Sequence, residues 1–350
     1  MTTRPAAPGA YVLGVDSGGS GLRVALGRAD ASAEPLTAVC AEPVRTGPGG
    51  IDAAHLLAQI LPAARELLVR AGASAPEEGG GKVAALAVGA AGMATLGGRL
   101  RAELPDALER ALGVRRPALA ADAVTAFAGA VGQGPGAVVA AGTGMIALGT
   151  DLTVWRRADG WGHLLGDNGG GAWIGRAGLE AAMRAHDGRH GGSPALLERL
   201  HAVFGPAEEL PGLLYPRADR PAVLASFAPE VAACAGADAV ADTILRTAAA
   251  HIADAAAAVC PADDPNPEVA LTGGLFRMGD PLLVPLREEL ARRVPAARVT
   301  TGGGDPLTGA LRIARALAVD DLRLPRHPTM LFVPEGPRGA EPAANPARNG

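Results

Sequence analysis

The chain has 350 residues, of which 48% are hydrophobic and 19% are charged, enough for well-packed cores and about two domains. Its formal net charge of −4 and isoelectric point near 6.0 exclude the strongly basic surface that typically binds nucleic acid or an anionic membrane. The first ten residues lack the apolar segment of a signal peptide, and no run free of glycine and charge reaches the ~18 residues of a membrane span. We therefore expect a cytoplasmic protein, in which the widely spaced Cys40, Cys234 and Cys260 are small apolar core residues.

A glycine-rich hairpin is predicted near the N-terminus, in the sequence YVLGVDSGGSGLRVALGR of residues 11–28. An apolar run reaches Asp16, breaks at Gly18, Gly19 and Gly21, and resumes with alternating apolar residues, a pattern typical of strand, turn and strand. A Walker phosphate loop or a dinucleotide fingerprint would instead lead from a strand into a helix. Backbone N–H groups in such a glycine turn can nevertheless hold phosphate without a lysine.

Asp16 stands at the mouth of this turn, where its carboxylate would repel a bound phosphate unless a cation lay between them. We therefore interpret Asp16 as a magnesium carboxylate that acts through water. The alternative is a plain β-hairpin in which Asp16 only starts the turn.

The following segments predict strands alternating with helices, as in a wound α/β domain. Strands are expected over residues 36–40, 83–88 and 117–121, and helices over residues 51–71 and 99–112. The second of these strands ends in Gly89-Ala90, whose small side chains would let a ligand approach the backbone. The third ends in Asp122, and the carboxyl ends of such strands are where sites are built.

Asp122 is the first choice for a catalytic group. Its apolar neighbours, residues 118–121, are expected to provide dry surroundings in which a carboxylate can act as a base. The alternative role is an N-cap for a helix over residues 123–130, which Asp fills well and which is compatible with catalysis.

The plan of the first hairpin recurs at residues 137–148. An apolar run is followed by Gly142-Thr143-Gly144 and by a resumed strand that starts at Met145. Such an internal duplication predicts two similar α/β halves, which face each other across a cleft and hold a polyphosphate from both sides.

A second glycine-dense segment, GWGHLLGDNGGG, covers residues 160–171 and precedes a helix expected over residues 172–184. An Asp followed by glycines before a helix can be a simple cap and turn, but one aromatic, one histidine and one acid in this setting favour a functional loop. We expect His163 to be a packed, hydrogen-bonded histidine, since no second His or Cys lies at metal-ligand spacing. For Trp161 the sequence allows two roles, stacking on a sugar face or packing on the core.

The rest of the chain is predicted to complete the second half. Helices are expected over residues 240–259, 282–293 and 306–319, and strands over residues 269–271 and 298–300. The first of these strands ends in the glycine pair Gly273-Gly274. Residues 189–238 show short helices and prolines without a chemical pattern, and residues 325–350 are rich in Pro, Ala and Gly, which is typical of a disordered tail.

Assembled in this order, these segments make the chain resemble the sugar kinase, heat-shock-70 and actin superfamily of ATPases. Within it, residues 12–319 are similar to the BadF/BadG/BcrA/BcrD ATPase family, and specifically to the N-acetylglucosamine kinases. The resemblance implies an α/β fold of two ribonuclease-H-like (actin-like ATPase) domains that face each other across a nucleotide and sugar cleft. We assign residues 10–121, completed by the helix at 306–319, to the first domain and residues 122–305 to the second.

The resemblance also implies the residues that carry each role. ATP would be bound by the two hairpin turns and the later glycine pair, which comprise Asp16, Gly18, Gly19, Ser20, Gly142, Thr143, Gly144, Gly273 and Gly274. The sugar would be bound by Thr46, Gly89, Ala90, Asp122, Met145, Ile146, Gly160, Trp161, Gly162 and Asp167. Asp122 falls where the family's general base lies.

Three departures from the family pattern concern the sugar, and none touches the phosphate machinery. The loop aligned with residues 46–50 offers only Thr46 where N-acetylglucosamine kinases usually place an Asn. The acidic residue that follows Gly-Asp in the family is Asn168 here, and the family's serine is missing at the loop aligned with Gly89.

Together these features predict an ATP-dependent kinase that phosphorylates a hydroxyl of N-acetyl-D-glucosamine, with O6 as the expected acceptor. Asp122 would accept the hydroxyl proton during in-line transfer, while Mg²⁺ and the two hairpins neutralise the triphosphate. The alternatives are a kinase for N-acetylmuramate or another amino sugar or hexose, a non-catalytic nucleotide or sugar sensor, and an ATPase activator. The activator would need paired cysteines for an iron–sulfur cluster, and Cys40, Cys234 and Cys260 do not fit that spacing. The family resemblance suggests a homodimer.

Overall fold

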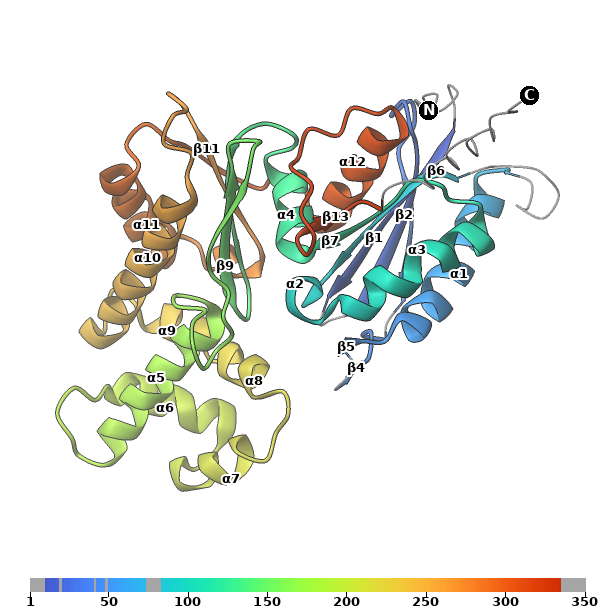
Figure 1. Cartoon of the computed structure of the whole chain (residues 1–350). Coiled ribbons are helices and arrows are strands. Elements are labelled where there is room, and N and C mark those ends of the chain that lie inside the picture. The colour runs from blue at the N-terminus through green and yellow to red at the C-terminus, as the bar shows by residue number, and fades with distance from the viewer. Residues whose placement is uncertain (1–9, 19–20, 41, 48–49, 74–82, 335–350) are drawn as a thin grey trace, which may run out of the picture. The chain divides into compact units, whose positions relative to one another are not determined.

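Two sheets, each led by a β-hairpin, organise the chain, one in each of two units (Figure 1). The computed structural model describes residues 10–18, 21–40, 42–47, 50–73 and 83–334. Unit 1 comprises Met1–Thr125 and Ala310–Gly350, and unit 2 comprises Ala126–Gly309. From the sequence we placed the domain boundaries at residues 121–122 and 305–306. In the structure the two units divide within α4 (Asp122–Ala130) and within α12 (Pro306–Ala318).

Unit 1 contains a six-stranded mixed sheet in the order β13-β7-β6-β1-β2-β3. Its strands are β1 (Tyr11–Gly18), β2 (Gly21–Arg28), β3 (Leu36–Cys40), β6 (Val83–Ala90), β7 (Pro117–Ala121) and β13 (Leu331–Phe332). β1 and β2 form the predicted antiparallel hairpin, and β1, β6 and β7 run parallel to one another. Asp16 is in register with Gly89, and Gly89 with Ala120, the second residue before Asp122. The parallel strands therefore end at one edge of the sheet, as the sequence predicted.

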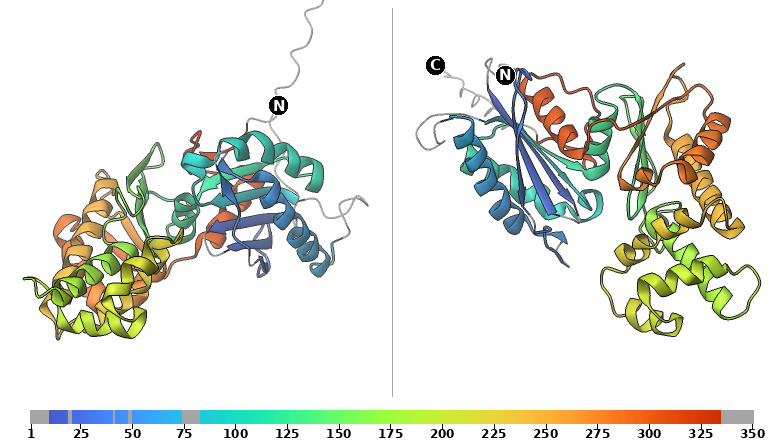
Figure 2. Two further views of the ribbon diagram at one scale, coloured as in Figure 1. Left: turned by 90° about the horizontal axis from the view of Figure 1, so that it is seen from below. Right: turned by 180° about the vertical axis from the view of Figure 1, so that it is seen from behind.

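The helices of unit 1 cover both faces of this sheet. α1 (Ala53–Arg70) and α3 (Gly98–Leu112) lie on one face and α12 lies on the other (Figures 1 and 2). α12 approaches β1 so closely that a Cβ on Gly14 would come within 2.6 Å of the Leu311 nitrogen, which is why a glycine interrupts that apolar strand. The short α2 (Met93–Leu96) and the two-residue strands β4 (Thr46–Gly47) and β5 (Gly50–Ile51) complete the described part of the unit.

Unit 2 repeats the same sheet plan in the order β10-β9-β8-β11-β12. Its strands are β8 (Gly136–Ala141), β9 (Met145–Thr150), β10 (Trp155–Asp159), β11 (Glu268–Thr272) and β12 (Arg298–Thr301). β8, β9 and β10 are antiparallel neighbours, and β8, β11 and β12 are parallel. Unit 1 has this arrangement in β3-β2-β1-β6-β7, so the predicted internal duplication is confirmed.

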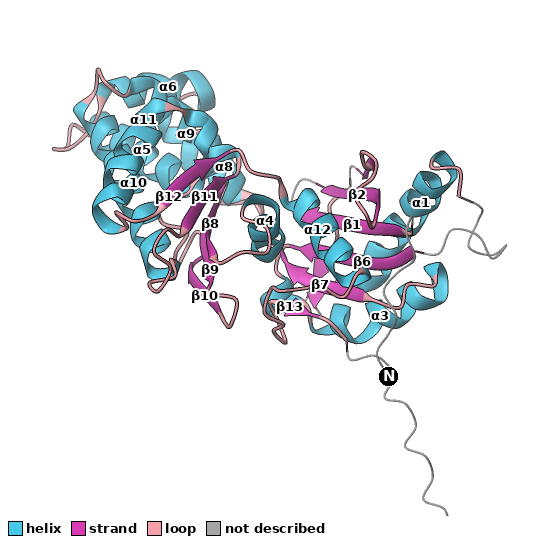
Figure 3. Ribbon diagram, turned by 90° about the horizontal axis from the view of Figure 1, so that it is seen from above, coloured by secondary structure: helices cyan, strands magenta, loops and turns pink. Residues whose placement is uncertain are grey.

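Helices cover the second sheet and extend beyond it. α10 (Ala239–Val259) and α11 (Asp280–Arg293) lie on one face, and α4 lies on the other (Figures 1 and 3). A helical cluster follows β10 in the chain and comprises α5 (Gly171–His186), α6 (Pro194–Phe204), α7 (Leu210–Leu214), α8 (Arg220–Ser226) and α9 (Ala228–Cys234). The last four helices occupy the stretch in which the sequence indicated only short helices.

Membrane-spanning character is absent from any single helix in the part of the chain that the structure describes. The segment Arg220–Cys234 and α10 meet the length and composition only as a pair, which is bent by 119°. Both belong to the core of unit 2, where Phe227 and Ile252 are fully buried.

Residues 325–334 are ordered, whereas the sequence placed them in a disordered tail. β13 pairs antiparallel with β7, with Leu331 opposite Ala120, and Leu331 is fully buried. The expectation was wrong because a two-residue strand is too short to show the alternation by which strands are recognised.

Candidate functional site

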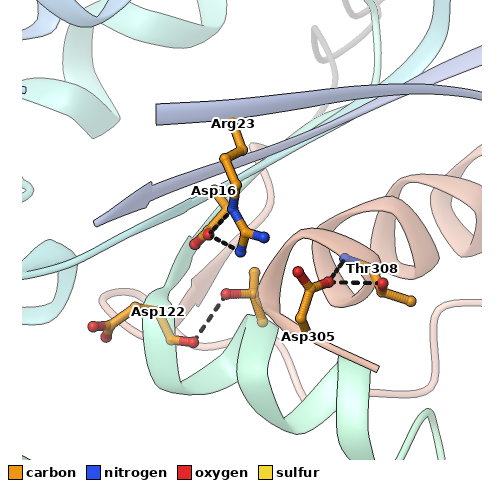
Figure 4. A network of polar contacts seen from close by, with 6 residues as sticks. Asp16, Arg23, Asp122, Asp305 and Thr308 are labelled. Atoms are coloured by element: carbon orange, nitrogen blue, oxygen red, sulfur yellow. Dashed lines mark hydrogen bonds and ion pairs between the residues drawn. The ribbon is translucent and has the colours of Figure 1, made fainter. Parts of the chain in front are cut away.

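The carboxyl end of β1 carries an ion pair across the first hairpin. Asp16 Oδ2 accepts hydrogen bonds from Arg23 Nη2 at 2.6 Å and from Arg23 Nε at 3.1 Å (Figure 4). The Asp16 side chain is only 14% exposed, and both of these bonds reach the same oxygen. Gly18 ends β1, while the predicted phosphate contacts Gly19 and Ser20 lie outside the described residues. Arg23 thus compensates the Asp16 charge beside the turn.

Asp122 is the first residue of α4, directly after the buried strand β7. Its Oδ1 accepts from the Ala123 N–H at 2.9 Å, and its carbonyl accepts from Thr125 Oγ1 at 2.9 Å. Figure 4 shows the carboxylate pointing away from the second contact. As the acidic residue in the first turn of α4, Asp122 lies at the positive end of the helix dipole. The side chain is exposed, however, so the dry surroundings expected from its neighbours are wrong, because Asp122 itself faces outward although Ala121 and Ala123 on either side are buried.

Gly89 is packed against the first turn of α4. A Cβ at this position would lie 2.6 Å from Thr125 Oγ1 and 2.7 Å from Thr125 Cγ2. Thr125 is fully buried, and its hydroxyl is the donor to the Asp122 carbonyl. Thr125 thus fills the space that any side chain at position 89 would need. Ala90 is buried at the end of β6, and Thr46 is exposed on β4, opposite Ile51.

The turn Gly142-Thr143-Gly144 is held by the N-terminus of α5. The N–H of Gly171 donates to the Gly142 carbonyl at 2.9 Å, and the N–H of Ala172 donates to the Thr143 carbonyl at 2.8 Å. Both donors belong to the first helical turn, whose N–H groups have no partner within the helix. The turn is thereby fixed through its carbonyl side, and the Thr143 side chain is exposed.

Asp167 contacts both this turn and its own loop. Its Oδ1 accepts from the Gly162 N–H at 3.0 Å, and its Oδ2 fills the space that a Cβ on Gly144 would need. Burial raises the pKa of this carboxyl, the Gly162 hydrogen bond opposes that rise, and the charge of Asp159 adds to it. The structure therefore brings together two predicted groups, the phosphate turn and the sugar acid.

The aromatic and apolar members of the predicted sugar set also lie in this region. Gly160 has φ +74° and has no room for a Cβ, which would meet the side chain of Ile146 at 2.8 Å. Met145 is buried, whereas Trp161 is 64% exposed with the guanidinium of Arg157 4.2 Å above its ring. Trp161 is therefore stacked on a cation and is not a core residue. His163 is half-buried, and no hydrogen bond joins its side chain to the described residues, so a hydrogen-bonded role for His163 stays a prediction.

Gly273 borders a cavity of about 320 Å³ at the carboxyl ends of β11 and β12. Leu271, Phe276 and Leu283 provide apolar lining. Arg277 lines the cavity as well, and its Nη2 would lie 2.9 Å from a Cβ on Gly274. Gly273 has φ +107° and abuts the Ala141 backbone, so no other residue fits there without strain. An apolar cavity with a few polar groups is suited to a planar organic ligand.

Metal-ligating side chains are sparse in the described residues, where no group of three His, Cys, Asp or Glu lies close enough to hold an ion. Asp305 caps the start of α12: its Oδ1 accepts hydrogen bonds from the Thr308 N–H at 2.9 Å and from the Thr308 hydroxyl at 2.8 Å (Figure 4). A metal ion beside Asp16 would therefore need further oxygen ligands from water or from a bound phosphate.

Sequence reasoning missed four residues at these places. They are Arg23, Arg157, Asp159 and Arg277. Asp159 directly precedes the glycine-dense segment, and this position beside a predicted functional loop was the one signal in the sequence. The arginines gave no signal because the chain is rich in arginine throughout.

Comparisons of sequence with known proteins show which family this chain belongs to. The model of the BadF/BadG/BcrA/BcrD ATPase family matches residues 13–311. The N-acetylmuramic acid/N-acetylglucosamine kinase of Clostridium acetobutylicum is 30% identical over 203 residues, which are 56% of this chain and 66% of that kinase. The match thus spans slightly less than two thirds of that relative.

Solved structures give a longer overlap. A protein of Chromobacterium violaceum, assigned as an N-acetylglucosamine kinase, is 30% identical with a TM-score of 0.66, and the match covers 88% of this chain and 99% of that one. A protein of Porphyromonas gingivalis with the same assignment is 17% identical with a TM-score of 0.61 over 87% and 98% of the two chains. The second likeness concerns the fold alone.

Proposed function

We propose, from the premise that this chain belongs to the BadF/BadG/BcrA/BcrD ATPase family, that it is an ATP-dependent amino-sugar kinase. The names of the 30% identical proteins from C. acetobutylicum and C. violaceum support this acceptor class. The structural observation that carries the proposal is the repetition of one sheet order in both units, each opening with a strand–turn–strand hairpin rich in glycine. Two such turns suit a triphosphate better than a single phosphate.

The nucleotide is proposed to bind through backbone groups. In unit 2 the carbonyls of Gly142 and Thr143 are engaged by α5, which supports a role for the opposite side of the turn and the exposed Thr143 hydroxyl in phosphate binding. The cavity beside Gly273 and Gly274 is proposed to take the adenosine. In unit 1 the turn that follows Gly18, at the end of β1, is proposed to contact the phosphates.

Asp122 is proposed as the general base. A sugar hydroxyl attacks the γ-phosphorus, its proton passes to an Asp122 carboxylate oxygen, and the bond to the β-phosphate oxygen breaks to release ADP. The hydrogen bond from the Ala123 N–H holds the carboxylate at the start of α4. The exposure of the side chain is compatible with a substrate that reaches it from solution.

Asp16 fits a magnesium ion that is held through water. Magnesium at phosphoryl-transfer sites takes one or two carboxylates together with substrate phosphates and water, and a single carboxylate bonded through Oδ2 leaves Oδ1 to accept from a metal-bound water. When bound, the ion would neutralise charge on the phosphates. Arg23 would hold the carboxylate in place from the other side.

The proposed acceptor is N-acetylglucosamine, phosphorylated at O6, with Trp161, Asp167 and Gly162 on the sugar. N-acetylmuramate is the second candidate, because it is named for the C. acetobutylicum relative and because Thr46 is the only polar side chain in its loop, which leaves room for a larger substituent. We also propose a homodimer, which the family resemblance suggests.

The test is ADP release, coupled to a spectroscopic readout, with ATP and Mg²⁺ against N-acetylglucosamine, N-acetylmuramate, glucosamine, N-acetylmannosamine and glucose. The proposal expects turnover with an N-acetylated sugar, and ³¹P coupling in the product identifies the phosphorylated oxygen. ATP binding without turnover on any sugar would contradict the kinase and favour a sensor.

A further inference from the structure

The loop after β10 is closed by a carboxylate that the proposed function leaves without a role. Asp159 Oδ1 accepts from the Asp167 N–H, and Oδ2 accepts from the Asn168 N–H at 2.9 Å and from Asn168 Nδ2 at 3.2 Å. The Asp159 side chain, at the start of the loop, therefore holds Asp167 and Asn168 at its end through both carboxylate oxygens.

The closure is tight enough to distort the backbone at both ends. Asp159 has φ +57° and Asp167 has φ +55°, the left-handed region that non-glycine residues rarely adopt. A Cβ on Gly166 would run into Asp159 Oδ1, so a glycine is required where the loop passes over the carboxylate. Such local strain persists only where surrounding bonds over-determine the geometry.

Arg157 fixes the same loop from the strand below. Its Nε donates to the Asp159 carbonyl at 3.0 Å, its Nη2 donates to the Gly160 carbonyl at 2.6 Å, and its guanidinium covers the Trp161 ring. We call the hydrogen bonds that the Asp159 carboxylate accepts from Asp167 and Asn168 the clamp. Asp159 is in register with Ile146 of β9, so the clamp is anchored in the sheet.

The neighbouring phosphate turn is held mainly by groups outside this clamp. Gly142 and Thr143 are held by the first turn of α5 through Gly171 and Ala172. Among the described residues, the loop meets this turn through the Asp167 carboxylate, which lies against Gly144, and meets the start of α5 through the Asp167 carbonyl, which accepts from the Gly170 N–H at 2.9 Å. Loss of the clamp should therefore release Asp167 and Trp161 while the turn keeps its geometry.

We propose that Asp159 is a positioning residue for sugar binding: its carboxylate holds the loop of residues 160–168 so that Asp167 and Trp161 meet the sugar. This inference rests on the proposed function, in which these two residues contact the sugar. Loss of the clamp should weaken the binding of the sugar but not of ATP, because nucleotide binding is assigned to groups that the clamp does not hold.

The test compares Asp159→Ala and Asp159→Asn with Asp151→Ala. Asp151 is a matched control, since its Oδ1 also accepts two backbone N–H groups, from Thr153 at 2.8 Å and Val154 at 3.1 Å, but in the turn between β9 and β10. Asparagine at 159 keeps one acceptor and replaces the other by a donor, so it should be intermediate.

For Asp159→Ala we expect the KM for the sugar to rise roughly tenfold or more, as for the loss of charge-assisted hydrogen bonds, while the KM for ATP changes less than about twofold. Amide hydrogen exchange over residues 160–170 should accelerate in Asp159→Ala and not in Asp151→Ala. Equal rises of both KM values, or an unchanged sugar KM beside accelerated exchange, would overturn the positioning role.

Unchanged exchange in Asp159→Ala would overturn the clamp itself. A wild-type protein that phosphorylates no sugar would defeat the proposed function and the sugar role of Asp159 with it, whereas the exchange measurement would still report on the clamp alone. The two failures are therefore distinguishable.

Discussion

Gly89→Ala should destabilise unit 1 and misplace Asp122, because the added methyl group has no space beside Thr125. The new Cβ would lie 2.7 Å from Thr125 Cγ2, about 0.8 Å inside the ~3.5 Å at which carbon atoms pack favourably. Thr125 cannot swing away cheaply, since it is fully buried and donates its hydroxyl proton to the Asp122 carbonyl at 2.9 Å. Overpacking of this kind costs about 1–3 kcal/mol.

Urea denaturation measures that cost, and a second substitution tests its cause. Thr125→Ala removes the two atoms nearest to the new Cβ, Oγ1 and Cγ2, and leaves Thr125 Cβ at 3.1 Å. It loses one hydrogen bond and one buried methyl, a cost of about 1–2 kcal/mol by itself. The double variant should then be about as stable as Thr125→Ala alone. This corresponds to a coupling of about 1–3 kcal/mol between two residues in contact.

The contact between position 89 and Thr125 should also affect kcat. A shift of the first turn of α4 moves Asp122, and a misplacement near 1 Å can reduce kcat by about 100-fold. We expect kcat to fall in Gly89→Ala and to return in the double variant to the level of Thr125→Ala. The reasoning is refuted if Gly89→Ala unfolds within about 0.5 kcal/mol of wild type, or if the two substitutions add.

Two further predictions concern carboxylates of unit 2. The folded pKa of Asp167 lies above its unfolded value because of burial, so its contribution to stability is present below the unfolded pKa and is lost as the pH rises through the folded pKa. Asp167→Asn should thus raise the Tm at pH 7 and not below pH 3.8, while it weakens sugar binding; a lower Tm at pH 7 would contradict this. Hydrogen bonds from Thr153 lower the pKa of Asp151 to about 2, so its stabilisation is present above 3.8 and lost as the pH falls through about 2. The Tm difference between wild type and Asp151→Ala should therefore close in acid, and a difference that persists at pH 2 would be the contrary result.

Local patterns in the sequence were sufficient to predict most helices and strands and the internal duplication. The glycine break after Asp16 and its repeat at Gly142-Thr143-Gly144 each separate two apolar runs, and both became hairpins in the same sheet order. The helix start at Asp305 was likewise readable, because a capping Asp before Pro is a local signal.

Contacts between distant residues were not readable from these patterns. Thr125 excludes a side chain at Gly89 from 36 positions away, and β13 finds β7 across more than 200 residues. Asp159 acquired its partners only because two residues adopt left-handed backbone, which no periodicity reveals. The exposure of Asp122 was misjudged since burial of a strand says little about the residue after it.

The most direct measurement of the central proposal is the steady-state rate of sugar phosphate formation by Asp122→Asn. Asparagine keeps an oxygen that can accept from the Ala123 N–H, so the start of α4 should be preserved, and calorimetric titration should show ATP and sugar still bound. We predict that kcat falls by about 100- to 10,000-fold, as for the loss of a general base. A kcat within about tenfold of wild type, with both substrates bound, would contradict the assignment of Asp122 as the base.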